Sequence, residues 1–362
     1  TIKTDLLLVG STREIVYDPV AIDKKINENK FLQKDLADFN ISDASGLLSC
    51  FLLADNELAE LSKDGFVNSD NFPFLEYFAP LNLYGFEKTV FRNWEMLVSY
   101  RQARYPKMTK APRGGREKID FHNAIARGFI QKGSYQDAEI EIGLANREEA
   151  FNKGALLNYG IFSAFFGKAD EAIANLESYL KQDPLNAEAN FYIAKVYDFK
   201  QNFDQALPHY QTAAQQEPKN DEYLFSYAQS LMRSPDKQKA IGVLQKVVEL
   251  AGLNIENGFA LSEAFVANQQ FEPAIKTLRL LSKEYPSFYG VYEEMARFYD
   301  DAHQYAQGLL VCREAQARFP FNARNYYLMS NFYEKLGNAH EARKMARIYS
   351  YYQNAPKIGI SE

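Results

Sequence analysis

Residues 187–220 read AEANFYIAKVYDFKQNFDQALPHYQTAAQQEPKN, and their pattern recurs on both sides at a period of 34 residues. One column at this spacing holds small residues: Ala126, Gly160, Ala194, Ala228, Ser262, Ala296 and Ser330. A second column is equally small: Ala138, Ala172, Ala206, Ala240, Ala274, Gly308 and Ala342. Unit ends are marked by Pro184, Pro218, Gly252, Pro286 and Pro320. The chain is therefore expected to repeat one helix–turn–helix unit.

The physical reason for these columns is packing between helices. Two antiparallel helices approach closely only where side chains are small, so Ala194 and Ala206 are predicted to let the helices of one unit touch. Large residues then fill the space against the next unit: Phe129, Tyr197, Leu231, Phe265, Tyr299 and Tyr333. A single unit cannot bury its own apolar face, so stacking of units supplies the core. Proline ends each second helix because it lacks the amide donor.

This pattern resembles a tetratricopeptide (TPR) array of seven units, spanning roughly residues 119–356. The resemblance implies an all-α, right-handed superhelix. It also implies that the first helix of each unit lines a concave groove, in which a peptide or helix of a partner protein is held. The expected function is accordingly that of a protein–protein interaction scaffold, without enzymatic activity.

The first 100 residues do not share the repeat and are expected to form a small α+β subdomain. Residues 5–11 predict one buried strand, and residues 18–30 and 55–63 predict short helices. Residues 101–118 contain two prolines and a Gly-Gly pair, and they carry 7 basic residues and one acidic residue. They predict a basic linker. A contact with anionic lipid or nucleic acid is the alternative interpretation of that segment.

This N-terminal part resembles the C-terminal end of spermidine-synthase-like (aminopropyltransferase-like) domains, particularly bacterial ones. The matching segments are residues 6–11, residues 46–53 and above all NSDNFP at 68–73, followed by Leu75-Glu76-Tyr77 and Ala79-Pro80. Ser69 and Asn71 depart from the family pattern. The resemblance implies a Gly-rich nucleoside-binding turn and acidic partners, which this sequence lacks. The alternative function is thus the non-catalytic C-terminal part of a polyamine-synthase-like protein whose active site lies upstream.

Composition limits the other classes of function. The net charge is −6, and phosphate binding needs clustered cations, so no nucleic-acid partner is expected. The two cysteines, Cys50 and Cys312, predict buried thiols. The four histidines lack metal-ligand spacing, so neither metal nor cofactor is expected. We expect a cytoplasmic protein that contacts a membrane only indirectly or through a segment upstream.

The candidate partner-binding residues lie on the expected groove face. Phe191, Phe225 and Phe259 occupy one column at consecutive repeats, and Tyr327 continues it. A contiguous apolar strip typically marks an interaction site. Flanking charge is supplied by Arg127, Lys195 and Arg297. The open alternative is that these rings pack between neighbouring first helices. The Lys and Asn pattern of TPR proteins that bind chaperone C-termini is not matched.

The last repeat predicts a covered surface. Its final helix contains Tyr349, Tyr351 and Tyr352, and an uncovered terminal face would leave apolar surface in water. We therefore expect self-association, or a partner, at the C-terminal repeat.

Overall fold

The structure is a computed structural model that describes residues 16–37, 39, 41–51, 57, 59–60, 63, 105–106, 108–109 and 112–354. The chain forms two compact units, Thr1–Gln182 and Asp183–Glu362. Regular structure in the described ranges is helical, and they hold one isolated parallel bridge, between Tyr17 and Met108. The strand predicted at 5–11 and the NSDNFP segment at 68–73 lie outside the described residues, so the α+β subdomain and its aminopropyltransferase resemblance stay predictions.

The described residues of the first unit form three N-terminal helices and two repeats. Its helices are α1 (Pro19–Glu28), α2 (Lys30–Ala37), α3 (Ala44–Leu48), α7 (Arg116–Gln131), α8 (Tyr135–Glu148), α9 (Lys153–Phe165) and α10 (Ala169–Leu180). The helix predicted over 18–30 is confirmed as α1, and the Asp18 carboxylate accepts a hydrogen bond from the Ala21 amide at its start. The first repeat begins at Arg116, inside the segment predicted to be a linker, because Arg116–Lys118 already form the first turn of α7.

The short helix α3 packs on α7, the first helix of the array. The approach is close, since a Cβ added to Gly128 would lie 2.6 Å from Ser49 Oγ. Lys132 Nζ donates to that same Oγ at 2.7 Å and to the Gly46 carbonyl at 2.9 Å. Burial lowers the pKa of this lysine. The N-terminal helices are therefore tied to the first repeat by both packing and hydrogen bonds.

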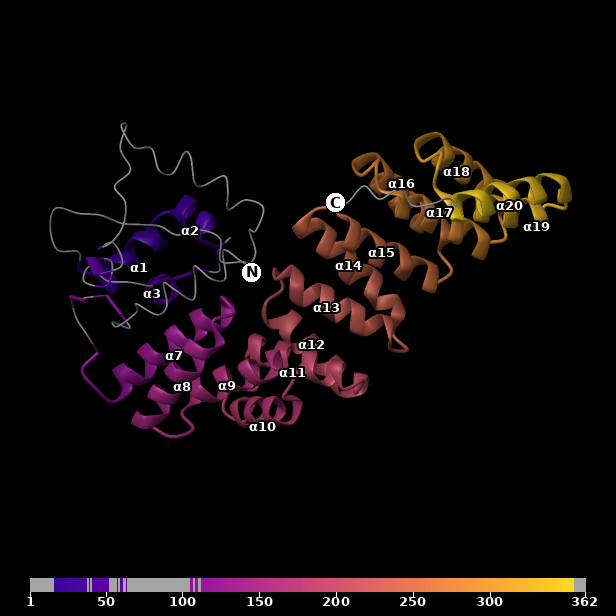
Figure 1. The fold of residues 1–362 in the computed structure, drawn as a ribbon. Coiled ribbons are helices and arrows are strands. Elements are labelled where there is room, and N and C mark those ends of the chain that lie inside the picture. The colour runs from indigo at the N-terminus through magenta and orange to yellow at the C-terminus, as the bar shows by residue number, and fades with distance from the viewer. Residues whose placement is uncertain are drawn as a thin grey trace, which may run out of the picture. The chain divides into compact units, whose positions relative to one another are not determined.

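The second unit contains five helix pairs, and each helix contacts the next (Figure 1). They are α11 (Ala187–Phe199) with α12 (Phe203–Gln216), α13 (Asp221–Met232) with α14 (Lys237–Ala251), α15 (Ile255–Ala267) with α16 (Phe271–Glu284), α17 (Tyr289–Asp301) with α18 (Tyr305–Arg318), and α19 (Ala323–Lys335) with α20 (Ala339–Asn354). With the two pairs of the first unit, these confirm the seven repeats predicted from the 34-residue period.

The small columns lie where the helices of a pair meet, as predicted. Ala194 and Ala206 are both fully buried. Where serine replaces alanine, its hydroxyl bonds across the contact: Ser330 Oγ donates to the Ala342 carbonyl at 2.9 Å. Ser262 Oγ donates within its own helix, to the Gly258 carbonyl at 2.7 Å. The buried hydroxyls thus have acceptors, which explains why serine is compatible with these positions.

Two further columns set the helix ends. The side chains of Asn186, Asn220, Asn254 and Asn322 each accept a hydrogen bond from an amide in the first turn of α11, α13, α15 and α19. The turn between the two helices of a pair contains one residue with a positive φ, in the left-handed region of backbone conformation. These residues are Gln201, Gln269, His303 and Gly337. The asparagine caps fix where α11, α13, α15 and α19 start, and the left-handed residues set how the chain turns from a first helix into the second helix of its pair. Among the helices of the described residues, none is long and apolar enough to cross a membrane.

Candidate functional site

The first helices of the second unit carry two hollows. The larger, called here the α11–α13 hollow, has a volume of about 770 Å³. It is lined by Lys195, Asp198, Phe199, Gln201, Phe203, Tyr210, Glu222, Phe225, Ser226, Gln229, Arg233 and Glu256. Most of these residues come from α11 and α13, and Glu256 adds the start of α15. We call the surface formed by α11, α13, α15, α17 and α19 the first-helix face.

Exposed aromatic rings are the unusual feature of the α11–α13 hollow. Phe199 is 76% exposed and Phe203 is 38% exposed, and both lie at the turn between α11 and α12. Phe225 contributes a half-buried ring from α13. Exposed rings gathered in a hollow supply the large apolar contact area on which protein-binding sites depend.

Charged side chains flank these rings. Arg233 forms an ion pair with Asp198, and its guanidinium lies 5.1 Å from the centre of the Phe203 ring. Lys195 lies 3.9 Å from a Glu222 carboxylate oxygen and 5.0 Å from the centre of the Phe191 ring. Deeper in the hollow, burial raises the pKa of Tyr210, with a smaller contribution from Asp198, so its hydroxyl is a neutral hydrogen-bonding group at physiological pH.

The smaller α17–α19 hollow has a volume of about 230 Å³. It is lined by Glu293, Glu294, Ala296, Arg297, Asp300, Arg324, Tyr327, Leu328, Asn331 and Phe332. Arg324 Nε donates to Glu293 Oε1 at 2.8 Å, and this bond raises the pKa of the Arg324 guanidinium. The same guanidinium lies 5.0 Å from the centre of the Tyr327 ring. This hollow therefore also combines a ring with charged groups.

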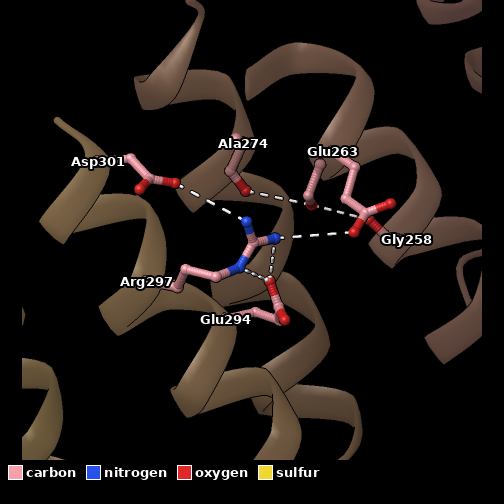
Figure 2. A network of polar contacts seen from close by, with 7 residues as sticks. Gly258, Glu263, Ala274, Glu294, Arg297 and Asp301 are labelled. Carbon is pink, nitrogen blue, oxygen red and sulfur yellow. Dashed lines mark hydrogen bonds and ion pairs between the residues drawn. The ribbon is translucent and has the colours of Figure 1, made fainter. Parts of the chain in front are cut away.

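Arg297 is the centre of an ion-pair network that joins α15 to α17 (Figure 2). Its Nε donates to Glu294 Oε2 at 2.8 Å, and its other nitrogens lie 3.7 Å from Glu263 and 3.8 Å from Asp301. One cation thus faces three carboxylates. The network fixes the arginine in place and leaves an excess of negative charge around it.

The structure brings together some of the predicted site residues and corrects one of them. Lys195 and Phe225 line the larger hollow, and Arg297 and Tyr327 line the smaller one. Phe259 is half-buried beside Phe288 and lines neither. Arg127 lies in α7 of the first unit and also lines neither.

Phe191 was predicted to be an exposed anchor, and this is wrong. Its side chain is 2% exposed. The ring stacks on Tyr223 of α13, with the centroids 4.4 Å apart, and Lys195 covers it from outside. For this residue the alternative holds, namely that the ring packs between neighbouring first helices.

Sequence reasoning missed Phe199 and Phe203. The column that contains Phe199 continues as Arg233, Ala267 and Asp301 at the 34-residue period, so no aromatic strip marks it in the second unit. An available signal was that Phe199 precedes a predicted turn, where a large ring has few neighbours to bury it. The residues of the described ranges hold no group of three or more His, Cys, Asp or Glu that could bind a metal ion.

The predicted C-terminal surface is mostly polar. Tyr349 and Tyr352 turn inward, against Tyr327 and Tyr326 of α19, at centroid distances of 5.5 Å. Tyr351 remains 72% exposed. The other exposed positions on α20 include Arg343, Lys344 and Arg347. The last helix therefore has the polar outer face of a capping helix, and the predicted self-association stays a prediction.

The fold is a helical-repeat array with hollows on its first-helix face. Residues 166–224 match the family model of the tetratricopeptide repeat. The match runs from α10 into α13, and the 34-residue period extends the same pattern over the seven helix pairs.

Solved structures of several repeat proteins are similar to the chain. MamA is 21% identical over 46% of this chain and 91% of its own, with a TM-score of 0.41. A tetratricopeptide repeat protein from Parabacteroides merdae is 18% identical over 67% and 96%, with a TM-score of 0.44. YrrB, a TPR protein with an unusual peptide-binding site, is 13% identical over 50% and 93%, with a TM-score of 0.39. A comparison with curated protein sequences gives no match.

Proposed function

We propose that the protein is an interaction scaffold that holds a peptide or helix of a partner protein on its first-helix face. The observation that carries the proposal is the α11–α13 hollow, where Phe199, Phe203 and Phe225 offer apolar area beside charged groups. A volume of about 770 Å³ is in the range that accommodates several side chains of a bound segment. Phe199 at 76% exposure makes no evident contribution to the core, which favours a role in binding.

Affinity capture with the full chain tests this proposal. The wild type, a Phe199→Ala/Phe225→Ala double variant and a Leu310→Ala control are each used as bait, and captured proteins are identified by mass spectrometry. Leu310 is a matched control because it is an apolar side chain, 54% exposed, on the second helix α18. A specific partner is expected with the wild type and the control, and capture is expected to fall about tenfold with the double variant.

One pattern of capture would contradict the proposal. A partner captured equally by the wild type and the double variant, but lost with Leu310→Ala, would place binding on the second helices. Circular dichroism of all three proteins checks that each is folded before capture.

The alternative, a non-catalytic part of a polyamine-synthase-like protein, has no support among the described residues, because the segments that carry that resemblance lie largely outside them. Incubation of the full chain with putrescine and decarboxylated adenosylmethionine tests it, and no spermidine is expected. Cytoplasmic localisation likewise stays a prediction.

A further inference from the structure

Charge is divided between the two helices of each pair in the second unit. The first helices, α11, α13, α15, α17 and α19, contain 11 acidic and 4 basic residues, and Arg233, the C-cap residue of α13, adds a fifth base to this face. The second helices, α12, α14, α16, α18 and α20, contain 6 acidic and 11 basic residues. The negative charge therefore lies on the helices that form the hollows, and not evenly over the unit.

Helix capping does not account for this excess. Acidic side chains stabilise a helix at its N-terminus and oppose its dipole at the C-terminus. Glu222 and Glu256 lie in first turns, where the dipole favours them. Asp198, Asp300 and Asp301, however, lie in the last turns of α11 and α17, where the dipole disfavours them. All three instead form ion pairs: Asp198 with Arg233, Asp300 with Lys335 and Asp301 with Arg297.

The bases on this face are already neutralised by its acids. Lys335 Nζ donates to Asp300 Oδ2 at 2.6 Å, and Arg233, Arg324 and Lys195 each have a carboxylate partner. Arg297 faces three carboxylates at once (Figure 2). The acids outnumber the bases on this face, so it keeps a net negative charge that attracts cations from outside.

The second helices instead carry bases that are not neutralised by neighbouring acids in the described ranges. Exposed bases on α14, α16 and α20 have no ion-pair partner within the part of the chain that the structure describes; they are Lys237, Lys276, Lys283, Arg343 and Arg347. The acidic excess is thus a property of the face with the hollows, and not of the whole unit.

The rings of the hollows already accept cations. The chain's own Arg233 and Arg324 lie 5.1 and 5.0 Å from the centres of Phe203 and Tyr327. Such contacts are favourable for a cation over an aromatic face. Phe199 lies in the same hollow with its ring largely exposed. A ligand that brings both cations and apolar side chains would match the rings and the acids together.

We propose that the segment held on the first-helix face is cationic and amphipathic: a stretch of a partner protein that carries Lys or Arg beside at least one large apolar side chain. This inference rests on the proposed function and specifies the chemistry of its partner. Charge complementarity of this kind sets specificity and speeds association.

Selection from a phage-displayed library of random peptides, with the folded full chain as bait, tests the inference. Enriched peptides are expected to contain more Lys and Arg than Asp and Glu, with an aromatic or aliphatic anchor. A Glu222→Lys/Glu256→Lys variant is expected to bind an enriched peptide about tenfold more weakly. The control, Glu249→Lys, changes an exposed glutamate on the second helix α14 and is expected to leave binding unchanged. Added salt should weaken wild-type binding.

The outcomes separate the two proposals. Enrichment of neutral or acidic peptides that need Phe199 and Phe225 would overturn the charge inference and leave the binding groove intact. Enrichment that is no better with the wild type than with Phe199→Ala/Phe225→Ala would contradict both. Equal loss of binding in the Glu222→Lys/Glu256→Lys and Glu249→Lys proteins would mean that only the net charge matters, and would also overturn the inference.

Discussion

Replacement of Phe191 by alanine should destabilise the second unit strongly. The side chain is 2% exposed and sits between α11, α12 and α13. Truncation of a buried phenylalanine costs about 3–5 kcal/mol. The ring stacks on Tyr223 at 4.4 Å and meets the edge of Tyr210 at 6.0 Å, and an aromatic pair adds about 0.5–1.5 kcal/mol beyond its buried area. We therefore expect a loss of about 4 kcal/mol.

Urea unfolding of the full chain, followed by circular dichroism, measures this loss. The matched control is Phe199→Ala, which removes the same side chain from the same helix at 76% exposure. Substitutions at exposed positions usually change stability by no more than about 0.5 kcal/mol. A loss below about 1 kcal/mol for Phe191→Ala, or equal losses for the two variants, would refute the assignment of Phe191 to the core and Phe199 to the surface.

Three further predictions follow from the packing. Gly308→Ala should lower the free energy of unfolding by about 1–3 kcal/mol, because its Cβ would lie 2.4 Å from the buried Phe332 ring. Gly242→Ala, in open space on α14, should raise it by about 0.5–1 kcal/mol. Urea titration measures both changes, and equal effects would contradict the packing. Gln269→Gly should raise stability by about 0.5–1 kcal/mol, because residue 269 has φ +60°, and a lower melting temperature than that of the wild type would contradict this. Burial raises the pKa of Cys312 to about 12, so at pH 8 its thiol is protonated and a thiol reagent should modify it only after unfolding; modification of the native protein at this residue would show that it is accessible.

Much of the fold could be predicted from the sequence because the same helix contacts recur in all seven repeats and require the same kinds of residue at the same positions. Ala194 and Ala206 had to be small for two helices to touch, and both are fully buried. The exposure of an individual ring could not be predicted in the same way. Phe191 and Phe225 occupy equivalent positions, yet Phe191 is buried and Phe225 is half-buried; Phe191 stacks on Tyr223, and the residue equivalent to Tyr223 in the next repeat is Asn257.

The site was harder to predict than the fold for a related reason. The first ring, Phe191, is covered by Tyr223, a residue on a different helix with no marker in its own column. Phe199 and Phe203 form a site with Arg233 because the turn between α11 and α12 lies beside the C-terminal end of α13, and the sequence does not show this proximity. Contacts between repeats depend on side-chain direction, and column position alone does not supply it.

The central claim is that a partner binds on the first-helix face, and carboxylate footprinting tests it most directly. The full chain is labelled with a carbodiimide and an amine, alone and with the captured partner segment, and modified residues are located by mass spectrometry. Glu222 and Glu256, which line the α11–α13 hollow, should lose most of their labelling when the partner is present. Glu249 and Glu284, exposed on the second helices α14 and α16, should be labelled equally with and without it. Protection of Glu249 and Glu284, with Glu222 and Glu256 still labelled, would contradict the claim.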